Sequence, residues 1–432
     1  MTAMTIAESL TLPNGQALKN RLIKGAMTEG LADARGRPTA ALIRLYERWA
    51  QGGTGVLLTG NVQVDRHHLE RAGNVIIDAV PDAEMAKLLS AFAQAGQRDG
   101  TKIWAQLSHA GKQTPFNINA APMSPSAVVL KGPAGMKFGQ PTAMTEADIL
   151  DVIERFVVAA QACKDAGFDG VQIHGAHGYL LSQFLSPKAN QRTDQWGGSL
   201  ENRARLLLAV VARIKPLTDA SFGLAVKLNS ADFQRGGFEL DDSIAVAGWL
   251  DTAGIDFLEV SGGTYEAPRM VGFTEDTGSG AQKSTQAREA YFIEFTPRIR
   301  AALSRTKLMV TGGFRSAAGM NEALSEDGVD LIGIGRPLCG QTDASARVLD
   351  GAAAMPRYED EVQFGPGPFS QSSRWQFFKQ FNTLASQSWY YQNLVRLGED
   401  RPLLKPGQLL RAALGYSRRD AALAKAIRAR SD

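Results

Sequence analysis

Short apolar runs alternate with longer amphipathic segments between residues 22 and 334 of the chain. We interpret the apolar runs as strands over residues 22–27, 55–64, 101–107, 171–174, 222–229, 256–260, 307–311 and 330–334. The segments between them carry apolar residues at helical spacing and predict helices over residues 38–51, 81–97, 146–166, 200–215, 241–253, 288–303 and 317–324. Strands that alternate with helices in this way require parallel, right-handed crossovers. The pattern therefore predicts an α/β protein, a closed (β/α)₈ TIM barrel.

Two segments depart from the strand-helix repeat. Residues 108–143 are too long and too rich in proline and glycine for an ordinary connection, which predicts a long insertion after strand 3 that lines the substrate site. From Tyr358 onward no further strand-helix unit occurs. Residues 375–391 are rich in aromatic side chains, which predicts helices that pack on the barrel or on a neighbouring subunit. We therefore expect a barrel over residues 1–357 and a mostly helical C-terminal extension over residues 358–432, with a basic, solvated helix over 420–430.

The composition narrows the class of partner. The chain of 432 residues carries 47 basic and 44 acidic side chains and a net charge of +3, so no charge excess favours a nucleic acid, and a small-molecule site is expected instead. The two cysteines, Cys163 and Cys339, cannot build a disulfide framework, which favours a reduced, cytoplasmic protein. The N-terminal residues do not form a basic segment followed by an apolar core, and no run of about 18 apolar residues occurs, which argues against secretion and a membrane span.

The densest chemistry lies in residues 171–203, VQIHGAHGYLLSQFLSPKANQRTDQWGGSLENR. The strand pattern places His174 at the C-terminal tip of a buried strand, where barrels hold their ligands. Gly175 and Gly178 bracket His177 in a tight loop, and Tyr179 follows directly. Two imidazoles and a phenol, all hydrogen-bond donors, should therefore project into one small volume.

This stretch resembles the Old Yellow Enzyme family, the FMN-dependent ene-reductases. The family's signature is a histidine, a histidine or asparagine three residues on, and a tyrosine two residues after that, and His174, His177 and Tyr179 match it. The segment RTDQWGGSLENR at residues 192–203 is also similar to the family's. The resemblance implies that FMN takes hydride from NADH or NADPH and reduces an electron-poor C=C bond. It further implies that the two histidines bind the substrate's carbonyl or nitro oxygen, and that Tyr179 donates the proton.

Two glycine-rich turns are candidates for phosphate binding. Gly312 and Gly313 follow strand 7, and Gly335 and Arg336 follow strand 8. Barrel enzymes commonly bind phosphate in these two loops, because glycine lets backbone N–H groups approach and an arginine pairs with phosphate through two hydrogen bonds. In the family that the chain resembles, the FMN phosphate lies here.

The resemblance also assigns residues to the flavin ring. Gln106 matches a glutamine that pairs with the pyrimidine edge, Lys227 stands where many members have an arginine that supplies positive charge, and Gly60 matches a small residue that lets the ring lie flat. The end of strand 1, Ala26, Met27 and Thr28, completes the set of cofactor-binding candidates, with Thr28 near flavin C4=O and N5.

Each assignment has an alternative. Lys227 could lie on the surface, Thr28 could cap a turn, and Tyr179 could belong to the core. His174 and His177 could instead ligate a metal, but a third ligand would have to come from the few other histidines at positions 67, 68 and 109, and no H-E-x-x-H motif occurs. We therefore expect no metal, and the competing functions are a metal-dependent barrel hydrolase and a flavin-binding protein without catalysis.

Overall fold

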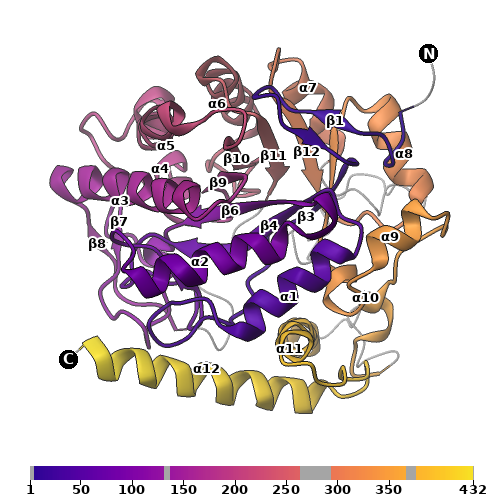
Figure 1. The fold of residues 1–432 in the computed structure, drawn as a ribbon. Helices are drawn as coiled ribbons and strands as arrows, with labels where there is room; N and C mark the ends of the chain where they lie inside the picture. The colour runs from indigo at the N-terminus through magenta and orange to yellow at the C-terminus, as the bar shows by residue number, and fades with distance from the viewer. Residues whose placement is uncertain (1–3, 131–136, 263–292, 366–375, 432) are drawn as a thin grey trace.

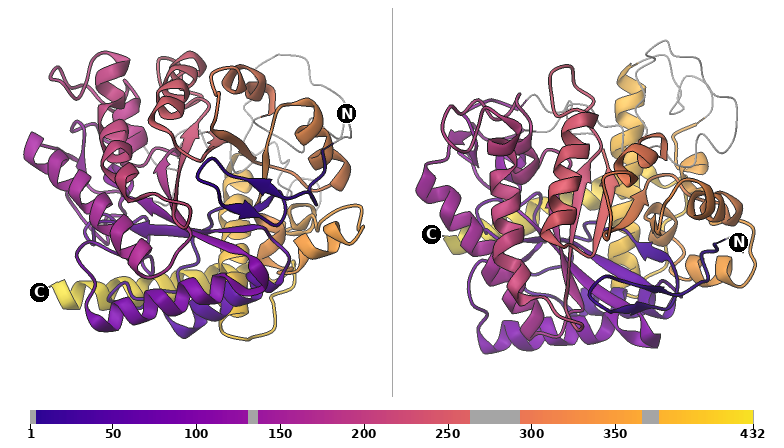
Figure 2. Two further views of the ribbon diagram at one scale, coloured as in Figure 1. Left: turned by 45° about the horizontal axis from the view of Figure 1, so that its top comes forward. Right: turned by 90° about the horizontal axis from the view of Figure 1, so that it is seen from above.

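The computed structural model describes residues 4–130, 137–262, 293–365 and 376–431, with the side chains of 376–381 and 430–431 excepted. Eight parallel strands close into a barrel at its centre, with helices outside them (Figures 1 and 2). In barrel order, the strands are β3 (Leu22–Lys24), β4 (Val56–Gln63), β6 (Lys102–Ser108), β9 (Gly170–Gly175), β10 (Gly223–Asn229), β11 (Phe257–Ser261), β12 (Lys307–Thr311) and β13 (Leu331–Ile334). The pairing of β13 with β3 closes the ring, and β5 (Val75–Ile76) adds to the side of β4. The predicted fold class is confirmed.

Five of the outer helices begin at a residue whose side chain caps the first turn. Thr39, Asp82, Thr145, Ser199 and Ser316 each accept a hydrogen bond from a backbone N–H of the first helical turn that would otherwise lack an intrahelical partner. The outer helices are α1 (Ala40–Gln51), α2 (Ala83–Gly96), α3 (Glu146–Asp165), α5 (Leu200–Ile214), α6 (Leu240–Ala253), α7 (Thr296–Arg300), α8 (Ala317–Glu326) and α9 (Ala344–Leu349).

Three details differ from the sequence prediction. The first strand ends at Lys24 instead of continuing to residue 27, because the chain leaves the sheet there to form a loop. The helix predicted over 288–303 lies partly outside the described residues, and its described part is a 3₁₀ turn followed by the short α7, which ends at Arg300. A short helix α4 (Leu180–Leu185), buried throughout, was not predicted because its apolar residues show no polar face.

Alternate residues of the strands fill the barrel interior in layers. Trp104 and Phe257 lie in a fully buried apolar layer, with ring centroids 5.0 Å apart. Two positions further along the same strands, the side chains that point to the same side are Gln106 and Glu259. The interior is thus apolar in the middle and polar toward the C-terminal ends of the strands.

An N-terminal hairpin closes the opposite end of the barrel. Its strands are β1 (Leu10–Thr11) and β2 (Ala17–Leu18), and Leu12 and Leu18 join the apolar layer. The Asn14 amide donates to the carbonyl of Asp219, which precedes β10. The hairpin therefore lies at the N-terminal ends of the strands, away from the predicted site.

The predicted insertion and extension are both present. Between β6 and α3 the chain forms a 3₁₀ turn and a two-stranded pair, β7 (Met123–Ser124) and β8 (Thr142–Ala143). After the barrel come α10 (Tyr358–Glu361), α11 (Gln376–Gly398) and α12 (Leu409–Ser431). Helix α11 packs on α1 and on α12, and the two ends of the chain lie on opposite sides of the molecule (Figures 1 and 2).

The solvated helix expected over 420–430 is the second half of a longer element. Helix α12 starts at Leu409, and Ala412 and Ala424 are buried on its inner side. The guanidinium of Arg71, in the connection after β4, lies 4.4 Å from the ring centre of Tyr391 on α11 and 4.8 Å from that of Tyr416 on α12. Stacking of a guanidinium against aromatic rings is favourable, so Arg71 joins the extension to the barrel.

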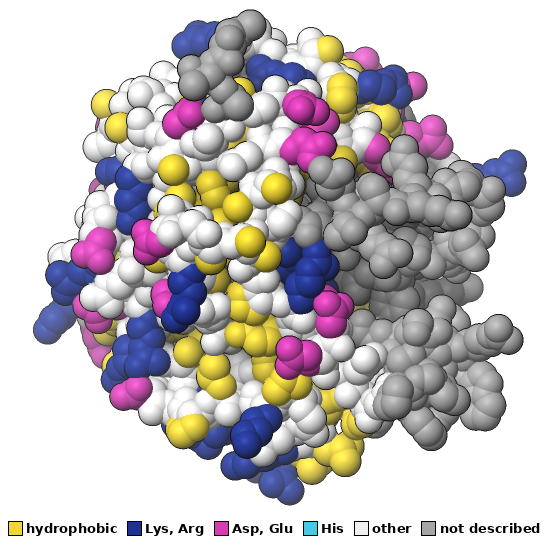
Figure 3. Space-filling model, turned by 90° about the vertical axis from the view of Figure 1, so that its right-hand side faces the viewer, with side chains coloured by type: hydrophobic (Ala, Val, Ile, Leu, Met, Phe, Trp, Pro, Cys, Tyr) yellow, Lys and Arg dark blue, Asp and Glu magenta, His cyan; other side chains and the backbone are white. Residues whose placement is uncertain are grey.

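The described part of the chain contains no helix that combines the length and the apolar composition of a membrane span. On the face in Figure 3, basic and acidic side chains are interspersed.

Candidate active site

One pocket at the C-terminal ends of the strands collects nearly all of the predicted site residues. Its lining includes, from the prediction, Ala26, Met27, Thr28, Gln106, His174, His177, Tyr179, Lys227, Gly312, Gly313, Gly335 and Arg336. These residues are spread along the sequence from position 26 to position 336, and the closed barrel brings them together.

Gly60 is the predicted residue that does not line this pocket. A Cβ atom at this position would lie 2.5 Å from the Met27 carbonyl oxygen and 2.9 Å from the Thr28 Cα, and it would also meet the Glu29 carboxylate. The space that glycine leaves is therefore filled by the loop after β3. Gly60 serves the pocket by letting Met27 and Thr28 reach it.

The turn after β9 has the tight geometry that its glycines suggested. His177 has a φ of 62° and Gly178 a φ of 78°, so two consecutive residues adopt the left-handed conformation, which is uncommon for a residue other than glycine. Asn229 accepts a hydrogen bond from the His177 N–H, and Gln113 donates one to its carbonyl oxygen. These contacts from β10 and from the insertion hold His177 in a conformation that costs free energy.

The two imidazoles meet edge to face, with ring centres 5.1 Å apart. His174 Nδ1 accepts the Ala176 N–H, which leaves its Nε2 protonated. His177 Nε2 lies 2.8 Å from the hydroxyl of Ser261, a pocket residue that the sequence analysis missed. Burial, and next the charge of Lys227, hold the pKa of both histidines well below 6.5, so both are neutral near pH 7.

Tyr179 lies against His174, with ring centres 4.9 Å apart. Its hydroxyl donates a 2.8 Å hydrogen bond to Glu70 Oε2, which also accepts from the Asn61 side-chain amide. Glu70 and Asn61 line the pocket and were not predicted. The phenol that was proposed as a proton donor is thus in direct contact with a carboxylate.

A chain of buried polar groups crosses the barrel below the pocket. Gln106 Nε2 donates to Gln172 Oε1 at 2.6 Å, Gln172 Nε2 donates to Glu259 Oε2 at 2.8 Å, and Glu259 Oε1 lies 2.9 Å from the Lys227 ammonium. All four side chains are buried. Lys227 is therefore not a surface residue, and its charge is balanced by Glu259, which sequence reasoning did not identify.

The predicted phosphate site is an open cradle of glycines. Gly312 and Gly313 have φ values of 150° and 85°, and a Cβ atom at Gly333 would collide with the Thr311 side chain. Thr311 Oγ1 is buried and has no hydrogen-bond partner among the described residues. The cradle therefore presents backbone and hydroxyl groups beside Arg336.

A further arginine was missed at this end of the pocket. Arg315, buried, pairs with Glu359 of α10 at 2.8 Å, and both line the pocket. The glycines of residues 312–313 precede Arg315 closely, which is the sequence signal that could have identified it.

Helix α11 of the extension forms one wall of the pocket. The wall consists of Thr383, Ser386, Gln387, Tyr390, Tyr391 and Leu394. These positions recur at helical spacing, three or four residues apart, so they share one helix face. The sequence shows this helical spacing. It does not show which strand ends this face of the helix covers.

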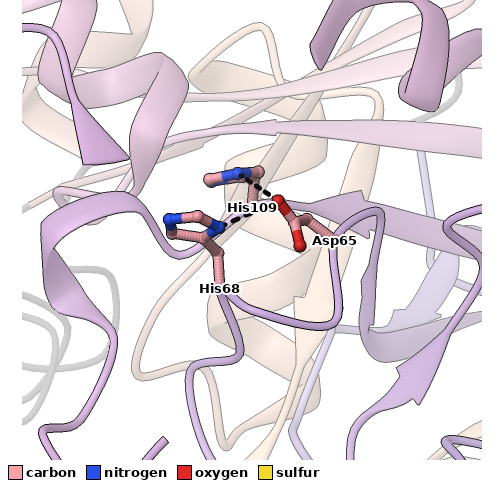
Figure 4. Close-up of side chains that lie close together, drawn as sticks. All are labelled: Asp65, His68 and His109. Atoms are coloured by element: carbon pink, nitrogen blue, oxygen red, sulfur yellow. Dashed lines mark hydrogen bonds and ion pairs between the residues drawn. The ribbon is translucent and has the colours of Figure 1, made fainter. Parts of the chain in front are cut away.

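Three other side chains form the one group with the spacing of a metal site among the described residues: Asp65, His68 and His109 (Figure 4). His68 Nδ1 lies 2.9 Å from the Asp65 carboxylate, and its Nε2 accepts the Met123 N–H. His109 Nδ1 accepts the Gly111 N–H, and its Nε2 faces Asp65 at 3.6 Å. Both acceptor nitrogens are therefore occupied by backbone N–H groups. The geometry is that of a buried hydrogen-bonded cluster that joins the insertion to β4 and β6.

This cluster makes stability depend on pH. Burial and the neighbouring His68 lower the pKa of His109 from 6.5 to about 4. Between these pH values the unfolded chain binds the proton more readily than the folded chain, so stability is full above about pH 6.5 and falls as the pH drops toward 4.

We expect His109→Gln to weaken this acid-induced loss, measured as the shift in the urea-unfolding midpoint between pH 7 and pH 4.5. The contribution removed should be on the order of 1–3 kcal/mol. His67→Gln, at an exposed neighbouring position, is the matched control and should keep the wild-type dependence. An identical pH dependence in His109→Gln would show that His109 is not held neutral.

Comparisons with known proteins show the family to which the chain belongs. The family described as "NADH:flavin oxidoreductase / NADH oxidase family" matches residues 8–354. An NADH-dependent flavin oxidoreductase of Neonectria sp. (strain DH2) is 37% identical over 78% of this chain, which spans 46% of that relative's length. Another, of Aspergillus parasiticus, is 37% identical over 77% of this chain and 75% of its own length.

The fold agrees as well. An Old Yellow Enzyme homologue from Zymomonas mobilis superposes with a TM-score of 0.67 at 25% identity, over 82% of this chain and 94% of its own. With the family match over residues 8–354, this likeness identifies the chain as an FMN- and NAD(P)H-dependent oxidoreductase that belongs to the NADH:flavin oxidoreductase / NADH oxidase family, the family of the Old Yellow Enzymes.

Proposed function

We propose that this oxidoreductase reduces the C=C bond of electron-poor alkenes, such as enones, enals and nitroalkenes, in the pocket above β9. The observation that carries the proposal is the meeting of two neutral imidazoles and a phenol at one strand end, beside a glycine cradle for phosphate. When bound, FMN would accept hydride from NADH or NADPH and pass it to the alkene in alternating half-reactions.

Two buried hydroxyl groups of the pocket residues have no hydrogen-bond partner among the described residues, which fits a polar ligand such as FMN. They are Thr311 Oγ1 and the hydroxyl of Tyr390. Both residues line the pocket, and Tyr390 lies near enough to Arg336 to feel its charge. Buried polar groups nearly always have a partner, so these atoms indicate a polar ligand. We assign the phosphate to Gly312, Gly313, Gly335 and Arg336.

The polar edge of the flavin would meet the buried chain of Gln106 and Lys227. Gln106 offers an amide, and Lys227 offers an ammonium group whose position is fixed by Glu259. Because Glu259 balances this charge, Lys227 acts more as a positioned hydrogen-bond donor than as an isolated cation. Thr28, with Ala26 and Met27, would contact the other edge of the ring.

His174 and His177 would bind the activating oxygen of the substrate. Donation of N–H groups to a carbonyl or nitro oxygen draws electron density from the conjugated alkene and stabilises the negative charge that develops on that oxygen. Neutral imidazole rings suit this role, because they donate a hydrogen bond without giving up the proton. Tyr179, directly beside His174, would then protonate the carbon next to the activating group.

We also propose the division of the chain into a barrel over residues 1–357 and an extension over residues 358–432. The packing of α11 on α1 supports an extension that lies on its own barrel.

The first test follows the visible absorbance of the flavin through reduction and reoxidation. The purified protein should be yellow, lose its visible absorbance with NADH or NADPH without oxygen, and regain it on addition of an enone. Reduction of the enone's C=C bond should match the flavin reoxidised. A protein that bleaches but is reoxidised only by oxygen would contradict the proposed substrate class.

The second prediction concerns Arg336. Arg336→Ala should purify largely without flavin, because the phosphate dianion is the main charge by which FMN can be anchored. The ratio of flavin to protein absorbance measures this. Arg347→Ala, an exposed arginine on the nearby α9, is the control and should retain the cofactor. A full flavin complement in Arg336→Ala would place the phosphate elsewhere.

The third prediction separates the half-reactions at Tyr179. Flavin reduction needs no proton from the phenol, so Tyr179→Phe should spare it, whereas reoxidation by an enone should slow by about 10²–10⁴-fold. Reoxidation by a nitroalkene should slow less, because its nitronate product can be protonated in water. Stopped-flow absorbance measures each phase. Equal slowing of both phases would mean that Tyr179 positions ligands and donates no proton.

A further inference from the structure

A second cavity lies between helices α11 and α12, which pack against each other in the C-terminal extension (Figure 1). Its volume is about 540 Å³, within the range of roughly 300–1,000 Å³ that small-molecule sites occupy. No aspartate or glutamate lines it among the described residues. Half of its lining is arginine, and we call it the arginine cavity after Arg396, Arg401, Arg411, Arg418 and Arg419.

The carboxylates near these arginines do not cancel their charge. Glu399 lies 3.0 Å from the Arg401 guanidinium and 2.7 Å from that of Arg419. Asp400 pairs with an arginine of α1, and Asp420 interacts with the arginine that joins the extension to the barrel. The five positive charges of the cavity are therefore balanced by one carboxylate.

Several guanidinium groups of the arginine cavity are available to a ligand. Arg411 and Arg418 are exposed and form neither a hydrogen bond nor an ion pair with any described residue. The Nε of Arg419 is buried and also lacks a hydrogen-bond partner in the described part of the chain. Burial, and next the charges of Arg401 and Arg411, lower the pKa of Arg396, so these positive charges repel one another.

The C-terminal end of α11 does not account for these arginines. The last carbonyl groups of a helix lack intrahelical partners, and cationic side chains commonly satisfy them. Two arginines of α1 already donate to the carbonyls of Leu397 and Gly398. Arg396 donates to the Pro402 carbonyl in the following turn. The other four arginines of the cavity make no hydrogen bond to the backbone of the described residues.

We propose that the arginine cavity binds a small anion with at least two phosphate groups, such as inorganic pyrophosphate or the polyphosphate chain of a nucleotide. Guanidinium groups pair with phosphate oxygens through two hydrogen bonds. A concave surface of one charge sign also concentrates counterions. Five arginines and one carboxylate leave four positive charges, more than a single phosphate group of about two negative charges can balance.

Helix α11 lies between this cavity and the active-site pocket. Tyr391 and Leu394 line the pocket, and the neighbouring Gln392 and Val395 line the arginine cavity. An anion bound to arginines of both helices would join α12 to α11, and so would hold the helix that forms one wall of the pocket. A ligand that binds only the folded chain stabilises it by mass action.

Calorimetric titration of the flavin-loaded protein with inorganic pyrophosphate tests the site. One pyrophosphate should bind per chain, and Arg411→Gln/Arg418→Gln should raise the Kd at least about 10-fold, because a hydrogen bond between charged groups contributes about that factor or more. Both side chains are exposed, so flavin content and the circular dichroism spectrum should stay unchanged. Absence of binding at millimolar pyrophosphate would overturn the inference.

The matched control is Lys425→Gln/Arg428→Gln. These two exposed side chains lie on the same helix but outside the cavity, so the variant loses the same charge and should keep the wild-type affinity. If both double variants weakened binding equally, the net charge of α12 would attract the anion and the cavity would not be a site.

Thermal unfolding gives a second readout. Pyrophosphate should raise the melting temperature of the holoenzyme in wild type and in the control variant, and should have little effect on Arg411→Gln/Arg418→Gln. Sodium chloride at the same ionic strength should not reproduce the rise. An equal rise with sodium chloride would contradict a specific site.

An anionic membrane is the competing occupant, because the exposed Leu410 and Leu414 of α12 adjoin the arginines. Cosedimentation with vesicles of phosphatidylcholine that contain phosphatidylglycerol, at roughly 0.15 M salt, distinguishes the two. A site for a small anion predicts that the protein stays in the supernatant. Retention on the vesicles that Arg411→Gln/Arg418→Gln loses would overturn the inference and assign the cavity to a lipid surface.

Discussion

The burial of one carboxylate governs how this pocket is built. Glu259 has no exposed surface, and a buried charge is costly unless it is paired and hydrogen-bonded. The structure meets this requirement with Lys227 on one oxygen and Gln172 on the other, and Gln106 orients Gln172 in turn. These four side chains come from four neighbouring strands, so their mutual satisfaction fixes the polar edge of the pocket relative to the barrel. Loss of any member would leave a buried group unpaired, at a cost of about 1–3 kcal/mol or more.

Burial, and next the cation of the same ion pair, keep the two histidines neutral. Lys227 pairs with His174 in the register of β10 and β9, and its charge adds to burial in keeping both imidazoles neutral. In the proposed reaction, a cationic histidine would compete with Tyr179 as a proton source, whereas a neutral one would only donate a hydrogen bond. The barrel would then assign the polarisation of the substrate and its protonation to different side chains.

The sequence was sufficient to predict the barrel and the residues at the ends of its strands. The spacing of apolar residues, the ends of the apolar runs and the glycine turns are all visible in short stretches of sequence. His174, His177 and Tyr179 lie within six residues, so one strand and one turn bring them together. Glu70 and helix α11 could not be found in this way. Their contacts with Tyr179 and the pocket depend on how distant loops fold over the barrel, which no local pattern encodes.

The pocket walls come from two parts of the chain, the barrel and helix α11. The barrel supplies the groups with proposed chemical roles, whereas a helix outside the family match of residues 8–354 supplies one side of the pocket. Residues such as Thr383, Ser386 and Gln387 can change without altering a strand, a cap or the buried ion pair. If the proposed site is the active site, replacement of this helix face is expected to change the substrate range while the proposed catalytic groups stay constant.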